Sequence, residues 1–447
     1  MSDFRQIADA LAAEIEDGRM PPGTRLDPVR RFAYARGIAV STANRVYAEL
    51  GRRGLVAGEI GRGTYVRSRL LGTPLAEPGR PGLIDFEFNF PTLPGQSALL
   101  AEGIRAVLAA ERLEDTMRPV GAQGHAAARA ASARHLARPG WAPDPGHFLF
   151  TGGGRQAIGA ALASVAAAGE RIGIEAMTYP AVKAMAGRLG QITVPLAMDD
   201  EGVTPDAVEA ACRLGPLKAL YLQPALHNPG GSTMGLARRQ ALVALARREK
   251  LVLIEDTVFG FLDQSGLPPL SALLPEQAIL VDGLSKRASP GLSGGMLVIP
   301  SDMLRRRATT AIRAGAWHAA PLGLAAATHW MDSGLLADLE ARKRADALAR
   351  QAVLRQALAG QSLLGDARAY HLWLELPEPW RADFFAAAAM RQGVAVTPSG
   401  AFAAAPGHAP NGVRIAFSSP GPDSVRRGAA ILAGLLAEGP EGLALSE

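Results

Sequence analysis

Short apolar runs alternate with alanine-rich helical stretches over most of the chain, and this alternation restricts the fold more than any other feature. Helix-like segments such as Gln156–Ala168 and Leu236–Lys250 separate the runs. Strands that alternate with helices form a largely parallel sheet covered by helices, so we expect an α/β domain from about residue 83 onward. The strand-like runs are FLFT (148–151), RIGIEA (171–176), KALYLQP (218–224), LVLIED (251–256), AILVDG (278–283) and MLVIP (296–300).

The pattern changes after about Gly315. A long helical region is followed by the strand-like pieces YHLWLELP (370–377), GVAVTP (393–398) and VRIAFSS (413–419). This order predicts a smaller α+β subdomain at the C-terminal end. We therefore divide residues 83–447 into a large part at about 95–315 and a small subdomain at about 316–447, to which we add the N-terminal segment of the domain.

The first 67 residues show a different pattern, with three short helices followed by two strand-like pieces. Helices are expected at Phe4–Asp17, at Pro28–Arg36 and at Thr42–Arg53, the last with Ser41 as its N-cap. The pieces LVAGEI and GTYVRS are joined around Gly61-Arg62-Gly63 and predict a β wing. Residues 68–82 carry Gly and Pro at irregular intervals, which is typical of a linker.

Positive charge is concentrated in one stretch, although the whole chain has a formal net charge of only +5. Between Arg30 and Arg69 there are nine arginines, against only Glu49 and Glu59. A local basic field suits a polyanion such as DNA. Charge alone is equally compatible with a solvated arginine-rich surface.

The sequence has neither a membrane span nor a secretory signal. No apolar run approaches the roughly 18 to 20 residues that cross a bilayer, and the start MSDFRQIADALAAEIEDG is amphipathic and partly acidic. We therefore expect a cytoplasmic protein. Cys212 is the only cysteine, so an intramolecular disulfide is excluded and a cysteine-based zinc site is not expected. We interpret Cys212 as a buried small hydrophobe, and we expect no metal site.

The segment from Ile7 to Val66 resembles the GntR-type winged helix. The matching motifs are P-G-T-x-L at 22–26, the Arg30 position, S-x-x-N at 41–44 and G-x-G-T-x-V at 61–66, whereas Asp27 stands where the family usually has proline. The resemblance implies double-stranded DNA as a partner, with the third helix in the major groove. The expected DNA contacts are Ser41, Thr42, Asn44 and Arg45 on this helix, with Arg30, Arg52, Arg62 and Thr64 around it. Val46, Tyr47 and Leu50 are expected in the core.

Three features of the α/β region have related chemistry. Among five lysines, Lys183, Lys218, Lys250 and Lys343 have the context of ordinary surface or helix-end residues, whereas Lys286 follows a strand in the glycine-rich sequence DGLSKRASPGLSGG. Asp256 ends the apolar strand LVLIED, where a carboxylate faces the ligand crevice of a parallel sheet. The loop TGGGRQA opens a helix whose amides can bind an anion. A lysine, a carboxylate and an anion site are the parts that pyridoxal phosphate (PLP) needs.

Together and in this order, the pieces resemble fold type I aminotransferases, and the whole chain resembles the MocR/GabR regulators. The resemblance implies that Lys286 forms the Schiff base with PLP, that Asp256 pairs with the pyridine nitrogen and that Asn228 binds the ring hydroxyl. It also matches Tyr179 to the aromatic that stacks on the ring. Arg414 matches the arginine that clamps a substrate carboxylate, and Asn89 matches the substrate-side segment. The remaining expected cofactor-binding positions are Gly154, Arg155, Phe259, Ser285 and Ser293.

The chain departs from the family at several of these positions. Phe259 stands in place of a tyrosine near the ring hydroxyl, Gly283 in place of a serine and Ser293 in place of an arginine. The phosphate loop has Gly154 and Arg155 where serine and glutamine are common. We expect PLP to be retained, with Arg155, rather than Arg287, supplying the missing cation at the phosphate.

The departures favour a sensor over an enzyme, because Phe259 cannot donate a hydrogen bond to the ring hydroxyl. We expect a PLP-dependent transcriptional regulator that responds to a small amine, an amino acid or PLP itself, with little or no full transamination. By the family resemblance it is a head-to-tail homodimer with residues of both chains near the PLP. Two alternatives stay open: a working aminotransferase with an attached DNA-binding domain, and a regulator whose large domain has lost PLP and only dimerises.

Overall fold

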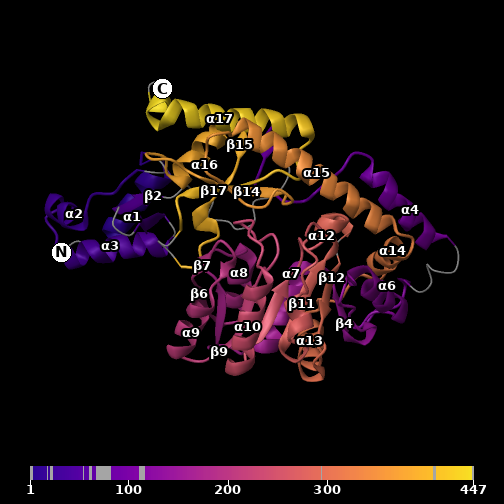
Figure 1. The fold of residues 1–447 in the computed structure, drawn as a ribbon. Coiled ribbons are helices and arrows are strands. Elements are labelled where there is room, and N and C mark those ends of the chain that lie inside the picture. The colour runs from indigo at the N-terminus through magenta and orange to yellow at the C-terminus, as the bar shows by residue number, and fades with distance from the viewer. Residues whose placement is uncertain are drawn as a thin grey trace.

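The computed structural model describes residues 4–17, 19–20, 24–53, 55–59, 63–66, 82–109, 116–292, 294–405 and 409–444. Three parts can be followed in Figure 1: an N-terminal module, a large α/β part and a smaller part above it that includes the C-terminal helix. The expected linker at 68–82 lies, apart from Gly82, outside the described residues. Within these residues, no helix has both the length and the apolarity required to cross a bilayer.

The N-terminal module contains α1 (Phe4–Glu16), α2 (Val29–Ala35), α3 (Val40–Arg52) and the antiparallel strands β1 (Val56–Glu59) and β2 (Gly63–Val66). The three predicted helices are confirmed, and the side chains of Val46, Tyr47 and Leu50 are buried as expected. The expectation that Ser41 caps α3 is wrong. The helix begins earlier, with the extended residue Ala39 as its N-cap and no side-chain cap, because the half-buried Ile38 packs on the core and brings the chain into the helix at Val40.

The large part is built on a seven-stranded sheet. All of its strand pairs are parallel except those of β12, which is antiparallel to both of its neighbours. The six predicted strands are present, and β6 was not predicted: it is an edge strand that contains a proline and has an exposed isoleucine, so it lacks the apolar run of the central strands. In spatial order the strands are β4 (Phe148–Thr151), β12 (Gly295–Val298), β11 (Ala278–Gly283), β10 (Val252–Asp256), β9 (Leu217–Leu222), β5 (Arg171–Glu175) and β6 (Ile192–Leu196).

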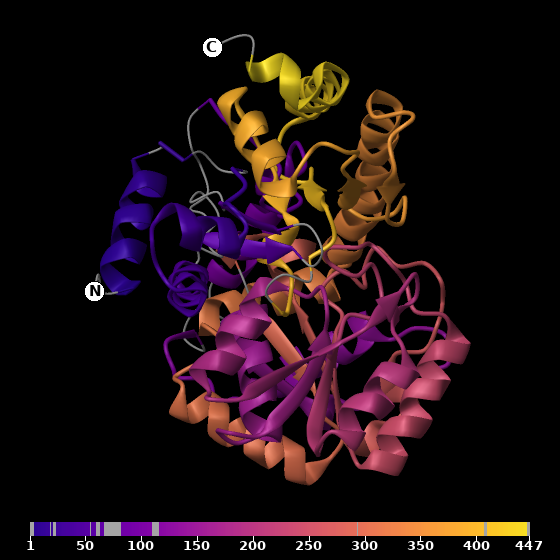
Figure 2. The same cartoon turned by 90° about the vertical axis from the view of Figure 1, so that its left-hand side faces the viewer.

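Helices cover both faces of this sheet (Figure 2). One face packs on α7 (Gly154–Val165), α8 (Pro180–Arg188) and α13 (Asp302–Ala314), and the other packs on α9 (Pro205–Arg213), α10 (Leu236–Glu249) and α11 (Leu270–Leu273). Beside β4 lie α4 (Gln96–Leu108), α6 (Ala126–Leu136) and α14 (Pro321–Asp332). The short elements are α12 (Leu284–Arg287), β7 (Met198–Asp199) and β8 (Gly202–Val203). Cys212, near the end of α9, is only partly buried, so the expectation of a fully buried thiol is wrong.

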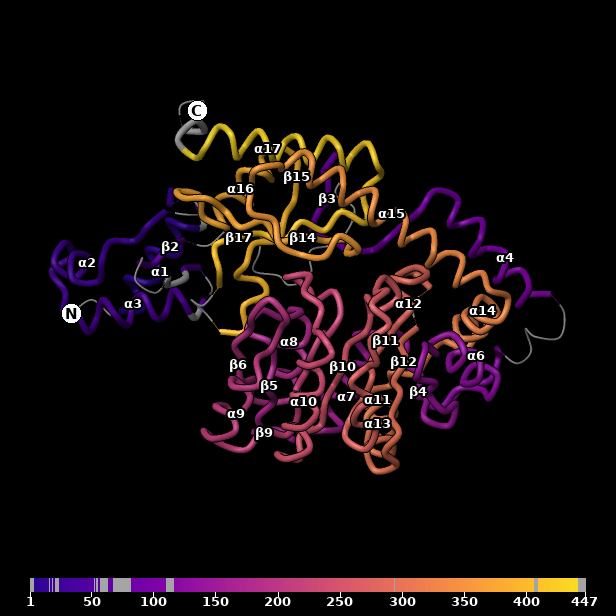
Figure 3. Tube along the Cα trace, in the orientation of Figure 1, coloured from indigo at the N-terminus to yellow at the C-terminus, as the bar shows by residue number. Residues whose placement is uncertain are grey.

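The smaller part contains a second, mainly antiparallel sheet, with the strand order β13 (Leu363–Leu364), β14 (His371–Glu375), β17 (Gly412–Ala416) and β16 (Thr397–Pro398). The strand β15 (Val394–Ala395) pairs in parallel with β3 (Ile84–Asp85), so the segment before α4 joins this part. Three helices pack around the sheet: α15 (Leu335–Ala357), α16 (Ala382–Arg391) and α17 (Pro422–Ala444). In Figure 3, α15 runs from this sheet towards α14 and so connects the two parts.

Gly103 offers a test of the packing beside the sheet. A Cβ atom at this position would lie 1.9 Å from Nε1 of the buried Trp330, so we expect Gly103→Ala to reduce the free energy of unfolding by about 2 kcal/mol. Gly434 of α17 has open space around it, and Gly434→Ala should instead stabilise by about 0.5–1 kcal/mol. Thermal unfolding of both variants checks this, and equal midpoints would contradict the packing at Gly103.

Candidate functional site

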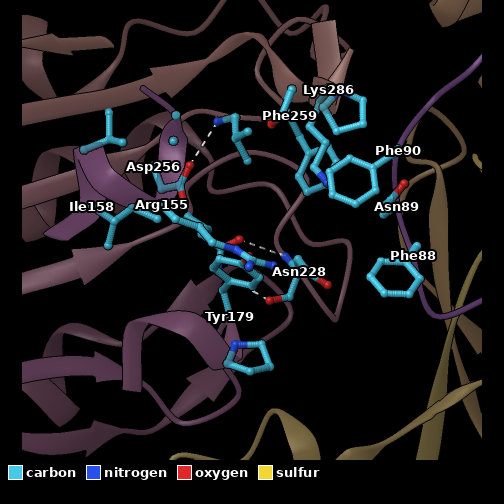
Figure 4. A pocket seen from close by; sticks show the side chains of 18 of the residues that line it. Phe88, Asn89, Phe90, Arg155, Ile158, Tyr179, Asn228, Asp256, Phe259 and Lys286 are labelled. Carbon is cyan, nitrogen blue, oxygen red and sulfur yellow. Dashed lines mark hydrogen bonds between the residues drawn. The ribbon is translucent and has the colours of Figure 1, made fainter. Parts of the chain in front are cut away.

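A pocket of about 510 Å³ lies at the carboxyl ends of the parallel strands, between the two sheets (Figure 4). Loops that follow successive strands supply its wall: Gly152–Arg155 after β4, Tyr179 after β5, Asn228 after β9, Asp256 at the end of β10 and Lys286 after β11. The segment 87–90 and Arg414 of β17 close the pocket from the smaller part. Ligands bind at this edge in open α/β sheets. The structure thus brings together the residues predicted from the sequence.

Lys286 projects into this pocket from the turn α12. Its Nζ atom lies 3.5 Å from the ring centre of Phe90 and 5.9 Å from that of Phe259. Burial lowers the pKa of Lys286 well below the ordinary lysine value, and the positive charges of Arg414 and Arg155 lower it further. The uncharged amine is the form of a lysine that attacks a carbonyl, and a lowered pKa increases the share of this form.

Asp256 is buried at the opposite wall. Its Oδ2 atom accepts a 2.5 Å hydrogen bond from the Tyr221 hydroxyl, and its Oδ1 atom accepts one of 3.0 Å from the Val258 amide. Burial raises the pKa of Asp256 to about 6, although the Tyr221 bond opposes this shift. The sequence did not single out Tyr221. It reaches Asp256 because it pairs with Ile254 on the adjacent strand, and that register was not known from the sequence.

The glycine-rich loop forms one end of the pocket. The helix α7 begins at Gly154, and its N-cap Gly153 has no side chain to bind the first amides, which leaves them available to an anion. A Cβ atom at Gly283 would lie 3.1 Å from the Gly294 carbonyl and 3.4 Å from the Gly154 Cα atom. Glycine at 283, where a serine is common in the family, therefore allows α12 to approach this loop closely.

The two candidate cations at this end differ in their environment. Arg155 is exposed to the pocket, and its Nε atom donates to the Tyr179 hydroxyl at 2.8 Å. Arg287 is buried, and its guanidinium binds Asp282 and Glu340 at 2.6 Å each. Of these two arginines, Arg155 lies at the loop and lines the pocket, and its role at the phosphate stays a prediction. Ser285 lines the pocket, and Ser293 lies outside the described residues.

Arg414 is buried on the other side of the pocket. One Nη atom donates to Asn228 Oδ1 at 3.1 Å, and the second donates to Thr397 Oγ1 at 3.0 Å and to the Glu87 carbonyl. Burial lowers the pKa of Arg414 to about 10. Both Nη atoms of the Arg414 guanidinium therefore have protein partners, whereas its Nε atom has none among the described residues.

Asn89 is held by a histidine that the sequence did not single out. His371 Nε2 donates to the His227 carbonyl at 2.9 Å, so the His371 Nδ1 atom accepts from Asn89 Nδ2 at 3.2 Å. Burial lowers the pKa of His371 to about 3, which keeps the ring neutral. Phe259 packs against the His371 ring, with the ring centres 5.5 Å apart.

The pocket retains unpaired polar atoms, which indicates a ligand. In the described part of the chain, Asn89 Oδ1, Gln156 Oε1 and Arg414 Nε are buried without hydrogen-bond partners, and all three residues line the pocket. Buried polar groups in native proteins are normally paired. A flat molecule with an anionic end, such as PLP, fits this pocket: Lys286 and Asp256 line it from opposite walls, and the open amides of α7 lie at one end.

Comparisons with known proteins agree with this geometry. The family model described as aminotransferase class I and II matches residues 81–432. The chain belongs to this aminotransferase family. The structure of LysN, an α-aminoadipate aminotransferase from Thermus thermophilus complexed with N-(5'-phosphopyridoxyl)-L-leucine, superimposes with a TM-score of 0.72 and 23% identity, over 82% of this chain and 94% of LysN. It shows that the aminotransferase region has the fold type I architecture.

Two curated relatives extend the similarity to transcriptional regulators. The HTH-type transcriptional regulator YdeF of Bacillus subtilis is 28% identical and covers 93% of this chain and 90% of its own length. The HTH-type pyridoxine biosynthesis transcriptional regulator PdxR of Corynebacterium glutamicum is also 28% identical, over 68% of this chain and 67% of its own. With the aminotransferase match, they confirm the resemblance to MocR/GabR-type regulators.

The predicted DNA contacts lie in the N-terminal module of this aminotransferase-family chain. Ser41, Asn44 and Arg45 are exposed along α3, and the Arg45 guanidinium lies 4.0 Å from the ring centre of Phe4. Arg30 on α2 is also exposed, whereas Thr42 and Thr64 are half-buried. The side chain of Arg52 and all of Arg62 lie outside the described residues.

The view that all lysines other than Lys286 are ordinary surface residues is wrong for two of them. Lys343 is fully buried in α15, and its Nζ atom donates to the carbonyl oxygens of residues 286, 287 and 288. Lys183 is partly buried and donates to the carbonyls of Ala401 and Ala403. Helix spacing did not reveal these roles, because each acceptor lies far away in the sequence.

The raised pKa of Asp256 predicts that this residue lowers the free energy of unfolding of the cofactor-free protein by an amount that depends on pH. The unfolded carboxyl titrates near 3.8 and the folded one at about 6, so folding is penalised fully above pH 6 and not at all below pH 3.8. We expect Asp256→Asn to stabilise the cofactor-free protein at pH 8 by up to about 3 kcal/mol, at about 1.4 kcal/mol per pKa unit. Urea unfolding between pH 8 and pH 4 measures this.

The increase in the free energy of unfolding caused by Asp256→Asn should become smaller as the pH falls, and it should disappear near pH 4. Asp200→Asn, at an exposed turn residue, is the control and should show no such trend. A gain of constant size over the whole pH range would show that the Asp256 carboxylate is not penalised by burial.

Proposed function

We propose that the protein is a PLP-dependent, DNA-binding transcriptional regulator that responds to a small amine, an amino acid or PLP itself. One observation carries the proposal: the pocket retains Lys286 and Asp256, yet it is lined by Phe259 where the family commonly has a tyrosine, in a chain that also carries the N-terminal helical module. Such a pocket keeps the groups that bind the cofactor and lacks a group that tunes its reactivity. Relatives named as transcriptional regulators support the same conclusion.

The pocket residues divide the work of holding the cofactor. The open amides of α7 and the Arg155 guanidinium would bind the phosphate, and Asp256 would hold a proton on the pyridine nitrogen. The Lys286 amine would make the covalent bond to the cofactor, while Tyr179 would cover the ring and Asn228 would contact the ring hydroxyl. When bound, PLP supplies an electron sink for chemistry at an amine carbon.

Phe259 weakens catalysis more than binding. A phenyl ring offers no O–H donor to the ring hydroxyl, and its neighbour His371 has both nitrogens engaged. We therefore expect reversible capture of amines with little complete transamination. Arg414 favours effectors with a carboxylate, because its unpaired Nε atom is a donor inside the pocket.

The N-terminal module serves as a GntR-type winged helix in this proposal. Residues 1–67 form the DNA-binding domain, residues 68–82 the linker and residues 83–447 the PLP domain. The exposed row of Ser41, Asn44 and Arg45 would enter the major groove of double-stranded DNA, with the β1–β2 hairpin as the wing. In a head-to-tail homodimer, two such modules would bind a bipartite operator, and effector binding would change their arrangement.

Arg155 provides the test of the cofactor site. We expect Arg155→Ala to weaken PLP binding by about 10- to 100-fold, since a charge-assisted hydrogen bond contributes about 1.5–3 kcal/mol. Titration of the cofactor-free protein with PLP, followed by visible absorbance, measures this. Arg188→Ala, at an exposed arginine of α8, is the matched control. Lys286→Ala should abolish the visible band, and an unchanged affinity in Arg155→Ala would disprove the role of Arg155.

The DNA-binding part is tested by two variants of the module. Asn44→Ala should relax sequence preference on the operator, because a base contact is lost, at a cost of about 1–3 kcal/mol. Arg30→Ala should weaken binding to all sequences and reduce the salt dependence by about one counterion. Mobility shifts at several salt concentrations distinguish the two effects. If both variants bind specific and random DNA as the wild type does, the module does not contact DNA through this face.

A further inference from the structure

The turn that carries Lys286 is too short to hold itself in place. It consists of α12, with four residues, and the backbone leaves helical geometry at Ala288. A four-residue helix leaves its last carbonyl groups without partners inside the helix. Gln96 Nε2 of α4 donates to the Ala288 carbonyl at 2.7 Å, and the partner that all three carbonyls share lies 57 residues further along the chain than Lys286.

Lys343 of α15 provides that partner. Its buried Nζ atom donates to the carbonyl oxygens of Lys286 at 2.9 Å, Arg287 at 2.7 Å and Ala288 at 3.1 Å. An ammonium group has three N–H donors, and all three are used here. The protonated group lies at the carbonyl end of α12, where a helix carries partial negative charge. Burial lowers the pKa of Lys343 to about 7, and the three carbonyl contacts offset the cost of burying the charge.

A second contact between α15 and the turn lies one helical turn before Lys343. Glu340 accepts from Arg287 Nη1 at 2.6 Å and from His135 Nε2 at 2.9 Å. Arg287 also binds Asp282 at the end of β11 through Nε and Nη2, at 3.1 and 2.6 Å. The backbone and the side chains of the turn are therefore both fixed to α15.

The far end of the same helix is fixed to the smaller part. Gln351 Nε2 donates to the carbonyls of Asp366, Ala369 and His371 at 3.0 to 3.1 Å. Arg350 donates to the Phe417 carbonyl at 2.8 Å. In Figures 1 and 3, α15 extends from the second sheet towards α14, with α12 beside it. The same helix therefore has hydrogen bonds to the Lys286 turn near one end and to the smaller part near the other.

We propose that Lys343 is a positioning residue for Lys286, and that it couples the Lys286 turn through α15 to the smaller part of the molecule. Occupation of the pocket then alters the order of α15, of the loop at residues 366–370 and of the start of β14 that Gln351 holds. The coupling rests on the proposed PLP binding, whereas the positioning of the turn does not require the cofactor.

Hydrogen exchange with mass spectrometry tests both parts. Without PLP, we expect Lys343→Met to accelerate exchange in residues 284–290 by at least about tenfold, because three hydrogen bonds are lost. With PLP, wild-type protein should gain protection at the start of α7, in residues 284–290 and in α15. In Lys343→Met, PLP should still increase protection at the start of α7 but should no longer increase it in α15. Lys343→Arg should restore the increase in α15.

The control variant removes buried side-chain hydrogen bonds to backbone carbonyls at a site far from the Lys286 turn in the sequence. The buried Gln191 donates to the carbonyls of Leu162 and Ala166 at the end of α7, at 2.9 and 2.7 Å. Gln191→Leu should lower stability and leave the exchange of residues 284–290 and the response of α15 unchanged. If Lys343→Met does not fold, Lys343→Gln keeps two N–H donors without the charge and should show a partial effect of the same kind.

The outcomes separate the two proposals. Wild-type protein that shows no PLP response at α7 would refute PLP binding, and the exchange of residues 284–290 without PLP would still decide whether Lys343 positions the turn. A normal α7 response with an α15 response in Lys343→Met and Lys343→Gln equal to that of the wild type would refute the coupling. If Gln191→Leu and Lys343→Met accelerate the exchange of residues 284–290 equally, Lys343 only stabilises the fold in general and does not position the turn.

Discussion

The parallel pairing of β9, β10 and β11 is the constraint on which the site depends. Parallel strands end at the same edge of the sheet, so Asp256 at the end of β10 and the Lys286 turn after β11 face one pocket. The same register brings the Tyr221 hydroxyl to Asp256. A shift of one residue in β10 would turn the carboxylate to the other face of the sheet, and the pocket would lose its acid.

Burial acts in opposite directions on the two reactive groups and favours the neutral form of both. It raises the pKa of Asp256 to about 6 and lowers the pKa of Lys286. A cofactor with a protonated ring nitrogen would offset the burial penalty on the Asp256 carboxylate, because an opposite charge lowers a carboxyl pKa. The lowered pKa of Lys286 would favour the uncharged amine, which is the form that reacts with an aldehyde.

The sequence predicted the large sheet well and the supporting interactions poorly. Central strands were recognisable because they are buried on both faces and form continuous apolar runs. Lys286 and Asp256 were recognisable because they follow such runs directly. Lys343, Tyr221 and His371 were not, since each acts on a residue that is distant in the sequence or on a neighbouring strand. The prediction that Ser41 caps α3 was wrong because it used only the general preference of hydroxyl residues for N-caps, whereas the packing of Ile38 determines where α3 begins.

The surroundings of Phe259 give the strongest physical reason to separate sensing from turnover. To replace the missing tyrosine hydroxyl as a hydrogen-bond donor to the ring hydroxyl, another residue beside Phe259 would have to supply an N–H or O–H group. His371 is neutral, donates to the His227 carbonyl and accepts from Asn89, so its ring offers no second N–H. Asn228 accepts from Arg414 through Oδ1, and only its amide nitrogen could donate. A single amide is a weaker hydrogen-bond donor than a phenol, so the surroundings of Phe259 do not replace the tyrosine hydroxyl that is common in the family, and this is the physical basis for the proposed weak turnover.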